Sequence, residues 1–242
     1  MYMNTIKVNF KNIIAHRGLS ALERENTASA FVAAGNRKNY GIETDVHVTL
    51  DGKYVIIHND DTEQVAGVNL PVEGSCFNDL RALRLLDTDG TKDRGDLIIP
   101  TVTEYIRICK RYEKHCFLEF KNAFKREQIA EICDFFIKED YIEHTTFISF
   151  VYENLLALRE LYPAATAQFL TGEMNDEVIN RCKKDNLGLD VEHHAITKET
   201  VEAAHAAGLE VNTWTVDALE DAERVISCGV DYITSNVLEY GE

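Results

Sequence analysis

Short apolar runs alternate with amphipathic segments along the 242 residues of the chain. The apolar runs are rich in Val, Ile and Phe, which is typical of buried strands, and the segments between them have helical periodicity. We predict eight strands, at "KNIIAH", "GIETDVHV", "HCFLEFK", "TTFISF", "TAQFL", "LGLDVE", "LEVNTWTV" and "VDYITSN". We predict seven helices between them, at about 26–34, 101–112, 125–139, 152–160, 175–184, 198–207 and 218–227.

Helix-start signals support this division of the chain. Thr101 and Glu104 have the spacing of a capping box, and so do Asp217 and Glu220. Eight strands with seven intervening helices is the element count of a (β/α)8 TIM barrel, which is an α/β fold. The alternation alone would also fit a doubly wound open sheet.

One segment, from about 59 to 99, interrupts the alternation. Its first part, "NDDTEQVAGVNLPVEGS", is too polar and too rich in turn residues for a barrel helix. We therefore expect a small insertion after strand two. Three prolines and thirteen dispersed glycines leave no obvious linker, so residues 1–242 are predicted to form a single domain.

Composition and charge narrow the class of partner. A hydrophobic content of 45% allows a large core, and the formal net charge of −16 opposes binding to nucleic acid or to anionic membranes. No run approaches the roughly 20 apolar residues of a membrane-spanning helix, and "MYMNTIKVNF" lacks the apolar stretch of a signal peptide. We therefore expect a soluble, cytoplasmic protein. The sequence gives no prediction of its oligomeric state.

Six cysteines, at positions 76, 109, 116, 133, 182 and 228, form no CxxC pair. Their spacing predicts neither a zinc site nor a disulfide framework. We expect reduced thiols, most of which fill the core.

Polar residues lie where several predicted strands end. His16 and Arg17 follow the first strand, and His58 ends the apolar run "YVIIH". In a TIM barrel the chemistry collects at this edge, although a single histidine at a strand end is more often structural. Asn26 or Thr27 is expected to cap the first helix, because both residue types are favoured at that position.

Carboxylates recur on two neighbouring strands. Glu43 and Asp45 lie two residues apart on strand two and therefore point to the same side, and Glu119 and Lys121 repeat this spacing on strand three. Three carboxylates with few cations nearby would repel one another, and a bound divalent cation would remove that repulsion. Oxygen ligands without a cysteine or histidine cluster indicate a hard ion, Mg²⁺ or Ca²⁺.

An ordered set of motifs runs through nearly the whole chain. It consists of "HRG" at 16–18, "ENT" at 25–27, "GIETDVHVTLDG" at 41–52, "VIIH" at 55–58, "FLEFK" at 117–121, "FISF" at 147–150, "VNTWTV" at 211–216 and "GVDYIT" at 229–234. In this order the motifs resemble those of the glycerophosphodiester phosphodiesterase family. The resemblance implies a TIM barrel with an inserted subdomain after strand two.

The resemblance also implies a reaction and roles for the residues. The substrate would be a small-molecule glycerophosphodiester, and the products sn-glycerol 3-phosphate and an alcohol such as choline or ethanolamine. The substrate's own 2-hydroxyl would attack first, giving a cyclic phosphate that water opens. The implied roles are metal binding by Glu43, Asp45 and Glu119, phosphate binding by Arg17 and Lys121, general base for His16 and general acid for His58.

Other residues near strand ends leave alternatives open. Trp214 could wall a glycerol pocket or simply pack the top of the barrel. His193 and His194 are predicted to lie in an exposed loop rather than in a second metal site. No role is assigned to four further polar residues near strand ends, which are Ser149, Gln168, Glu192 and Asn236.

The chain departs from the family pattern at three positions. Arg24 stands where a proline usually precedes "ENT", Asn59 replaces the aspartate after the second histidine, and Gln64 occupies a position that is often arginine. Two other functions remain open. One is a lysophospholipase D-like phosphodiesterase on the same barrel, and the other is a non-catalytic binding barrel.

Overall fold

The computed structural model describes residues 4–241, and within them eight parallel strands form a closed barrel. Around the barrel the strand order is β2, β10, β9, β8, β7, β6, β5 and β3, and pairing of β2 with β3 closes the ring. The strands are β2 (Ile13–Ala15), β3 (Gly41–Val48), β5 (His115–Phe120), β6 (Thr145–Ser149), β7 (Thr166–Thr171), β8 (Gly188–Glu192), β9 (Val211–Trp214) and β10 (Tyr232–Ser235). The predicted TIM barrel is therefore confirmed, and the open sheet is excluded. The first three residues of "MYMNTIKVNF" lie outside the described part.

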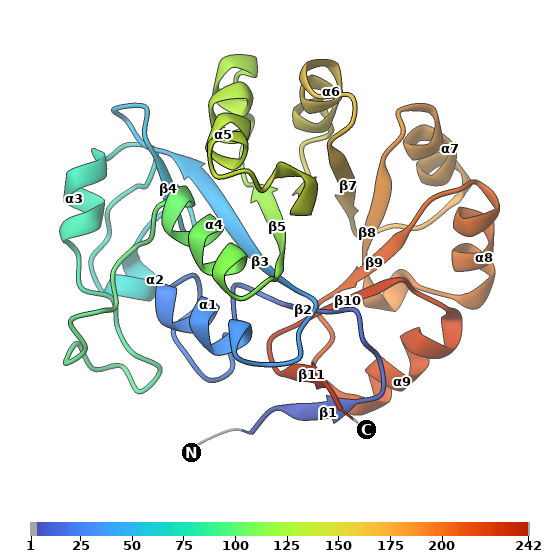
Figure 1. Cartoon of the computed structure of the whole chain (residues 1–242), viewed down its shortest axis with the longest axis horizontal. Coiled ribbons are helices and arrows are strands. Elements are labelled where there is room, and N and C mark those ends of the chain that lie inside the picture. Colours follow the sequence, from blue (N-terminus) through green and yellow to red (C-terminus); the bar gives the residue numbers. More distant parts are fainter. Residues whose placement is uncertain (1–3, 242) are drawn as a thin grey trace.

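Helices surround the barrel (Figure 1). In the described chain, seven of them connect successive barrel strands: α1 (Ala28–Gly35), α4 (Val102–Arg111), α5 (Arg126–Lys138), α6 (Tyr152–Leu161), α7 (Asp176–Lys184), α8 (Lys198–Ala206) and α9 (Leu219–Cys228). Two short 3₁₀ helices accompany them, η1 (Ile142–His144) before β6 and η2 (His193–Ala195) after β8. All seven predicted helices are present, with ends shifted by a few residues.

The core has an outer and an inner part because side chains alternate along each strand. The outer part fills the space between strands and helices and includes Phe31 of α1 and Tyr105 of α4. Four buried residues form the inner apolar cluster: Ile14, Phe117, Ile148 and Leu170. The six cysteines are unbonded, and four of them are buried, as the core-filling prediction requires.

The segment after β3 forms a separate lobe beside the barrel (Figure 1). β4 (Tyr54–Ile56) pairs antiparallel with β3, and the short helices α2 (Glu63–Ala66) and α3 (Phe77–Ala82) follow. A distinct apolar cluster joins Val55 of β4 to residues as far along as Ile99. We infer that this lobe is an inserted segment of one barrel domain, because its apolar cluster includes Val55 of β4, and β4 pairs with the barrel strand β3.

Two short strands outside the barrel were not predicted. β1 (Ile6–Val8) and β11 (Leu238–Tyr240) pair in parallel below the barrel, where Figure 1 shows them side by side. The buried Glu239 of β11 forms ion pairs with Lys7 and Arg37. In the described chain the element that follows β10 is β11 rather than an eighth helix.

Helix caps test the sequence signals directly. Thr27 caps α1, because its hydroxyl accepts a hydrogen bond from the backbone N–H of Ala30, and Thr101 forms the predicted capping box with Glu104. The capping box predicted at Asp217 is wrong: α9 starts after Ala218 without a side-chain cap.

In the described residues no helix has both the length and the apolar character needed to span a bilayer.

Candidate active site

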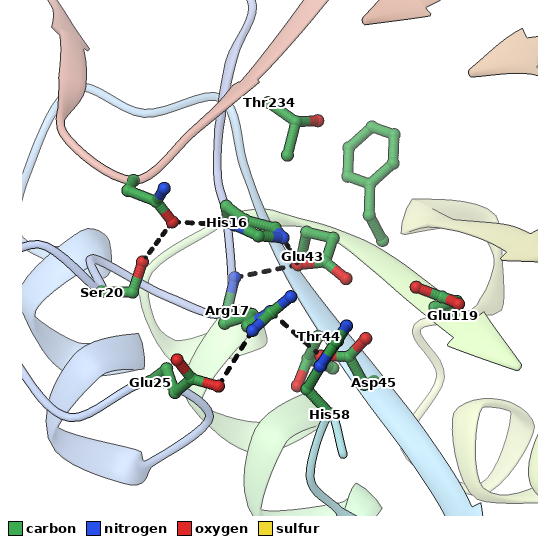
Figure 2. A network of polar contacts seen from close by, with 12 residues as sticks. His16, Arg17, Ser20, Glu25, Glu43, Thr44, Asp45, His58, Glu119 and Thr234 are labelled. Atoms are coloured by element: carbon green, nitrogen blue, oxygen red, sulfur yellow. Dashed lines mark hydrogen bonds and ion pairs between the residues drawn. The ribbon is translucent and has the colours of Figure 1, made fainter. Parts of the chain in front are cut away.

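Three buried carboxylates meet at one end of the barrel. Glu43 and Asp45 both point inward from β3, and β5 places Glu119 directly opposite Asp45 in the strand register. One oxygen from each of the three lies within 4.8 Å of the others. Figure 2 shows Glu43, Asp45 and Glu119 gathered beside the two histidines His16 and His58. The structure therefore brings together the predicted metal ligands.

The electrostatics of this cluster are unfavourable without a cation. Burial, followed by the charges of its neighbours Asp45 and Glu119, holds the pKa of Glu43 well above its usual range. Burial and the charge of Asp45 raise the pKa of Glu119 to about 8. Among the described residues, Asp45 Oδ1 and Glu119 Oε1 have no well-aligned hydrogen bond, and both lie near one ammonium group, that of Lys121. Buried, underpaired carboxylate oxygens are the donors that a hard divalent cation prefers, so these residues fit such an ion.

His16 follows β2 and is held by a chain of hydrogen bonds. Its Nδ1 lies 2.8 Å from Oδ1 of Asn236, and the amide of Asn236 donates to Asp217 Oδ2 at 2.7 Å. Because a carboxylate only accepts, the Asn236 amide must face Asp217, which leaves its oxygen as the acceptor for His16 Nδ1–H. His16 Nε2 is then a free acceptor, 3.9 Å from Glu43 Oε2. Burial and the charge of Arg17 lower the pKa of His16 to about 4.

Arg17 occupies a left-handed backbone conformation, with φ of 53°. This conformation lets its backbone N–H donate to Glu43 Oε2 at 2.9 Å, while its guanidinium lies against Glu25 at 3.0 Å and Asp45 at 3.6 Å. Gly18 follows with φ of 77°, and a Cβ there would lie 2.7 Å from the backbone of Ala30. The "HRG" motif therefore packs the loop onto α1 and turns Arg17 toward the acids.

Lys121 and His58 complete the polar side of the site. The ammonium of Lys121 lies 3.1 Å from Glu119 Oε1 and 3.6 Å from Asp45 Oδ1. Burial would raise the pKa of Asp45, but the charges of Arg17 and Lys121 outweigh it and hold this pKa below its usual value. Burial lowers the pKa of His58, and the charge of Asp45 opposes the shift.

The three departures from the family pattern have visible contacts. His58 Nδ1 lies 2.7 Å from Asn59 Oδ1, and Asn59 in turn donates to Gln64 Oε1 at 2.6 Å. Two neutral amides therefore stand behind His58. Arg24 donates to the Asp87 carbonyl at 2.8 Å and so ties the loop after β2 to the inserted segment.

A cavity of about 110 Å³ opens among these groups. It is lined by polar and apolar residues: His16, Arg17, Glu43, His58, Glu119, Lys121, Asp190, Thr215, Thr234, Ile148, Phe150, Leu170 and Trp214. Trp214 has both roles considered from the sequence. It lines the cavity, and it packs edge-to-face against Phe150, with the two ring centroids 5.5 Å apart. Its indole N–H donates a hydrogen bond to the backbone carbonyl of Asp190.

Other strand-end residues lie outside this cavity. The exposed-loop prediction is wrong for His193, which is buried in η2 against Arg224, whereas His194 is exposed as predicted. Together with Glu192, the two histidines form a second group of potential metal ligands. Ser149 donates to the carbonyl of Phe120 and so supports the barrel.

Three functional candidates were missed by the sequence reasoning. Asn26, considered only as a cap, donates to Asp45 Oδ2 at 2.7 Å and accepts from Thr44. For Asn236 and Asp190 the sequence gives no signal beyond their place near the end of a strand and within one. Thr27 of the family motif "ENT" is the helix cap, so Asn26 is not needed for capping. Its presence in the motif was the signal that could have indicated a role for Asn26 in the site.

A barrel of this topology, with acids, histidines and cations around one cavity at the carboxyl ends of its strands, defines a TIM-barrel enzyme. Residues 16–239 match the sequence model of the glycerophosphoryl diester phosphodiesterase family. The chain belongs to this family.

Individual relatives agree with this assignment. The glycerophosphodiester phosphodiesterase of Caldanaerobacter subterraneus subsp. tengcongensis is 29% identical over 227 residues, covering 93% of each chain. That of Bacillus altitudinis is 25% identical over 232 residues, covering 91% of this chain and 92% of the relative. An Oleispira antarctica phosphodiesterase, solved in complex with the product sn-glycerol-3-phosphate, has the same fold, with a TM-score of 0.87, 24% identity and 94% coverage of both chains.

Proposed function

We propose that this protein hydrolyses glycerophosphodiesters to sn-glycerol 3-phosphate and an alcohol, with the help of one divalent cation, Mg²⁺ or Ca²⁺. The observation that carries the proposal is the convergence of three buried carboxylates, two histidines and two cationic side chains on one cavity. Family membership and the product-bound Oleispira antarctica relative support the choice of substrate.

Glu43, Asp45 and Glu119 are the proposed metal ligands. When bound, the cation would neutralise phosphate oxygens as negative charge develops in the transition state. Arg17 and Lys121 flank the same acids, so they are placed to hold the remaining phosphate oxygens. Asn26 fixes Asp45 by its hydrogen bond to Oδ2, which leaves Oδ1 directed to the site.

The two histidines are the proposed proton carriers. His16 presents an unprotonated Nε2 to the cavity because Asn236 holds its Nδ1–H, and this arrangement suits a general base for the attacking hydroxyl. The family resemblance indicates that this hydroxyl is the substrate's own 2-hydroxyl. His58, which lines the same cavity, would then donate a proton to the departing alkoxide.

A compact substrate is favoured over a lysophospholipid. The cavity of about 110 Å³ matches a short glycerol arm, whereas a glycerol arm that carries an acyl chain would need a longer apolar groove. The non-catalytic alternative required loss of one of the five acid or histidine side chains, and all five are present at the cavity or cluster.

The proposed function is tested by measuring release of sn-glycerol 3-phosphate from glycerophosphocholine, glycerophosphoethanolamine and glycerophosphoglycerol. The assay is run after chelation and then with Mg²⁺ or Ca²⁺ added back. Metal-dependent release from at least one substrate supports the proposal. Hydrolysis of lysophosphatidylcholine alone would favour the lysophospholipase D-like activity, and no release from any substrate would contradict an enzymatic role.

Replacing Arg17 with lysine should lower kcat/KM by roughly 10- to 100-fold although the charge is kept. A guanidinium can hold two phosphate oxygens while it contacts Glu25 and Asp45, and an ammonium cannot reproduce that fork. Steady-state kinetics check this. Arg37→Lys is the control, because Arg37 pairs with Glu239 away from the cavity. Near-normal kinetics for Arg17→Lys would show that Arg17 has only a structural role.

Replacing Asn59 with aspartate should shift the alkaline limb of the pH–rate profile upward, by on the order of one pH unit. A carboxylate beside Nδ1 raises the pKa of His58, which burial lowers in the present chain. A general acid works only when protonated, so activity falls as pH rises through its pKa, and a raised pKa moves that fall to higher pH. An unchanged limb would contradict the role of His58 as the acid.

A further inference from the structure

Asp190 is a buried acid that the proposed mechanism does not use. It lies on β8 between Leu189 and Val191, which both face the outer core, so Asp190 points into the barrel. Asp190 is 1% exposed and lines the cavity that also contains His16 and His58. No donor within residues 4–241 reaches its Oδ1.

The surroundings of Asp190 favour its neutral form. In the strand register its neighbours are Leu170 on β7 and Asn212 on β9, neither of which is charged. Burial alone holds the pKa of Asp190 well above its usual value. A neutral carboxyl group has one O–H donor and one carbonyl acceptor, which together match an alcohol hydroxyl that both accepts and donates. Leaving the donor and the acceptor of such a buried carboxyl group without hydrogen-bond partners costs free energy.

The position of β8 in the ring tells which part of a substrate Asp190 can meet. β8 is four strands from β3 in both directions, so Asp190 lies across the barrel from Glu43 and Asp45. The apolar side chains of Leu170 on β7 and Trp214 on β9 flank β8 and line the same cavity as Asp190. A phosphodiester held beside the carboxylates would therefore extend one short arm across the barrel to the buried wall that contains Asp190 and Leu170, which we call the closed end.

We propose that Asp190 is a specificity-determining residue that hydrogen-bonds the terminal hydroxyl of the substrate's glycerol arm. The inference rests on the proposed function and deepens it, since it assigns the glycerol arm to the closed end and the departing alcohol to the open side. The closed end suits the arm that is constant and small. The departing alcohol varies in size among glycerophosphodiesters and must leave during the reaction.

The test compares glycerophosphocholine with its analogue lacking the terminal hydroxyl, propane-1,2-diol phosphocholine, which keeps the attacking 2-hydroxyl. The wild type should prefer the glycerol substrate by about 10- to 100-fold in kcat/KM. Asp190→Leu should lose this preference, mainly because its kcat/KM falls for the glycerol substrate and changes little for the analogue. Asp190→Asn should keep most of it, because an amide also donates and accepts. Gln168→Leu is the control, since Gln168 is equally buried on β7 but does not line the cavity.

Each other outcome contradicts the inference in a different way. Equal losses on both substrates in Asp190→Leu would make Asp190 structural. Loss in both Asp190 variants on glycerophosphocholine, but not on glycerophosphoglycerol, would mean that Asp190 recognises a cationic head group. An unchanged preference in Asp190→Leu would remove Asp190 from the site.

A binding measurement separates this inference from the proposed function. Calorimetric titration with sn-glycerol 3-phosphate and with propane-1,2-diol phosphate needs no turnover. The wild type should bind the glycerol compound more tightly by a similar factor, and Asp190→Leu should bind both alike. If the enzyme hydrolyses no glycerophosphodiester but this difference is found, the proposed reaction fails and the subsite stands. If hydrolysis is found without the difference, the subsite fails alone.

Discussion

Replacing Glu43 with glutamine should reduce turnover by roughly 10²–10³-fold or more while the barrel stays folded. Glu43 supplies one of three converging carboxylates and also accepts the Arg17 backbone N–H, which a glutamine oxygen can still accept. The substitution therefore removes charge without removing shape. Because burial and like charges hold the pKa of Glu43 well above its usual range, the metal-free variant should be at least as stable as the metal-free wild type.

Thermal unfolding checks this prediction independently of activity. Mg²⁺ or Ca²⁺ should raise the unfolding temperature of the wild type, since a ligand of the folded state alone stabilises it, and should have little effect on Glu43→Gln. Glu239→Gln is the matched control, because Glu239 is an equally buried carboxylate on β11, outside the site. Full activity of the wild type in excess chelator would remove the metal assignment.

Alanine at the two histidines should give different losses on different substrates. His58→Ala should lose about 10²–10⁴-fold on glycerophosphocholine, whose alkoxide needs a proton, and far less on a glycerol nitrophenyl phosphodiester. His16→Ala should be severely impaired on both, because every substrate needs its attacking hydroxyl deprotonated. The free Nε2 of His16, fixed by Asn236, is the structural basis of this expectation.

Comparing the two alanine variants on both substrates also tests the other possible roles of His16 and His58. Exchanged patterns would reverse the roles of base and acid, and equal losses on both substrates would mean that the roles are not divided. His205→Ala serves as the control, since His205 pairs with Asp231 on the opposite, amino-terminal side of β10 and does not line the cavity.

The local sequence pattern was enough to predict the barrel, but not the pair of short strands β1 and β11 outside it. The alternation of apolar runs and helical segments predicts the number of barrel strands and helices. It left an open sheet possible, and the pairing of β2 with β3 is what closes the ring. β1 and β11 have three residues each, as β2 does, but in the described part of the chain they pair only with each other and across almost the whole chain, which no local pattern indicates. Asp217 has the spacing of a cap, yet its carboxylate bonds Ser235 and Asn236, because tertiary partners compete with the helix end for the same oxygens.

The site was predictable where charge alone signals function. Acids at alternate strand positions, and histidines where strands end, are visible in sequence, and all the predicted site residues except Asp45 line the cavity, with Asp45 completing the acid cluster. Asn26 and Asn236 act through hydrogen bonds to residues at a distance in the chain, for which sequence spacing gives no signal. Asp190 resembles any polar residue on a strand, and only its lack of a partner in the described structure distinguishes it.

The pairing of β2 with β10 has a consequence for the order in which the protein becomes functional during its synthesis. His16 leaves the ribosome before the rest of the barrel is made, whereas Asn236, whose side chain lies 2.8 Å from its ring, follows 220 positions later. Until β10 arrives, one edge of β2 is uncovered and loop closure across the whole ring remains to be made. A nascent chain can therefore fold its helices and most of its sheet while remaining inactive. Truncation after β9 should leave a protein that holds the acids of β3 and β5 yet lacks Asn236, the hydrogen-bond partner of the His16 ring.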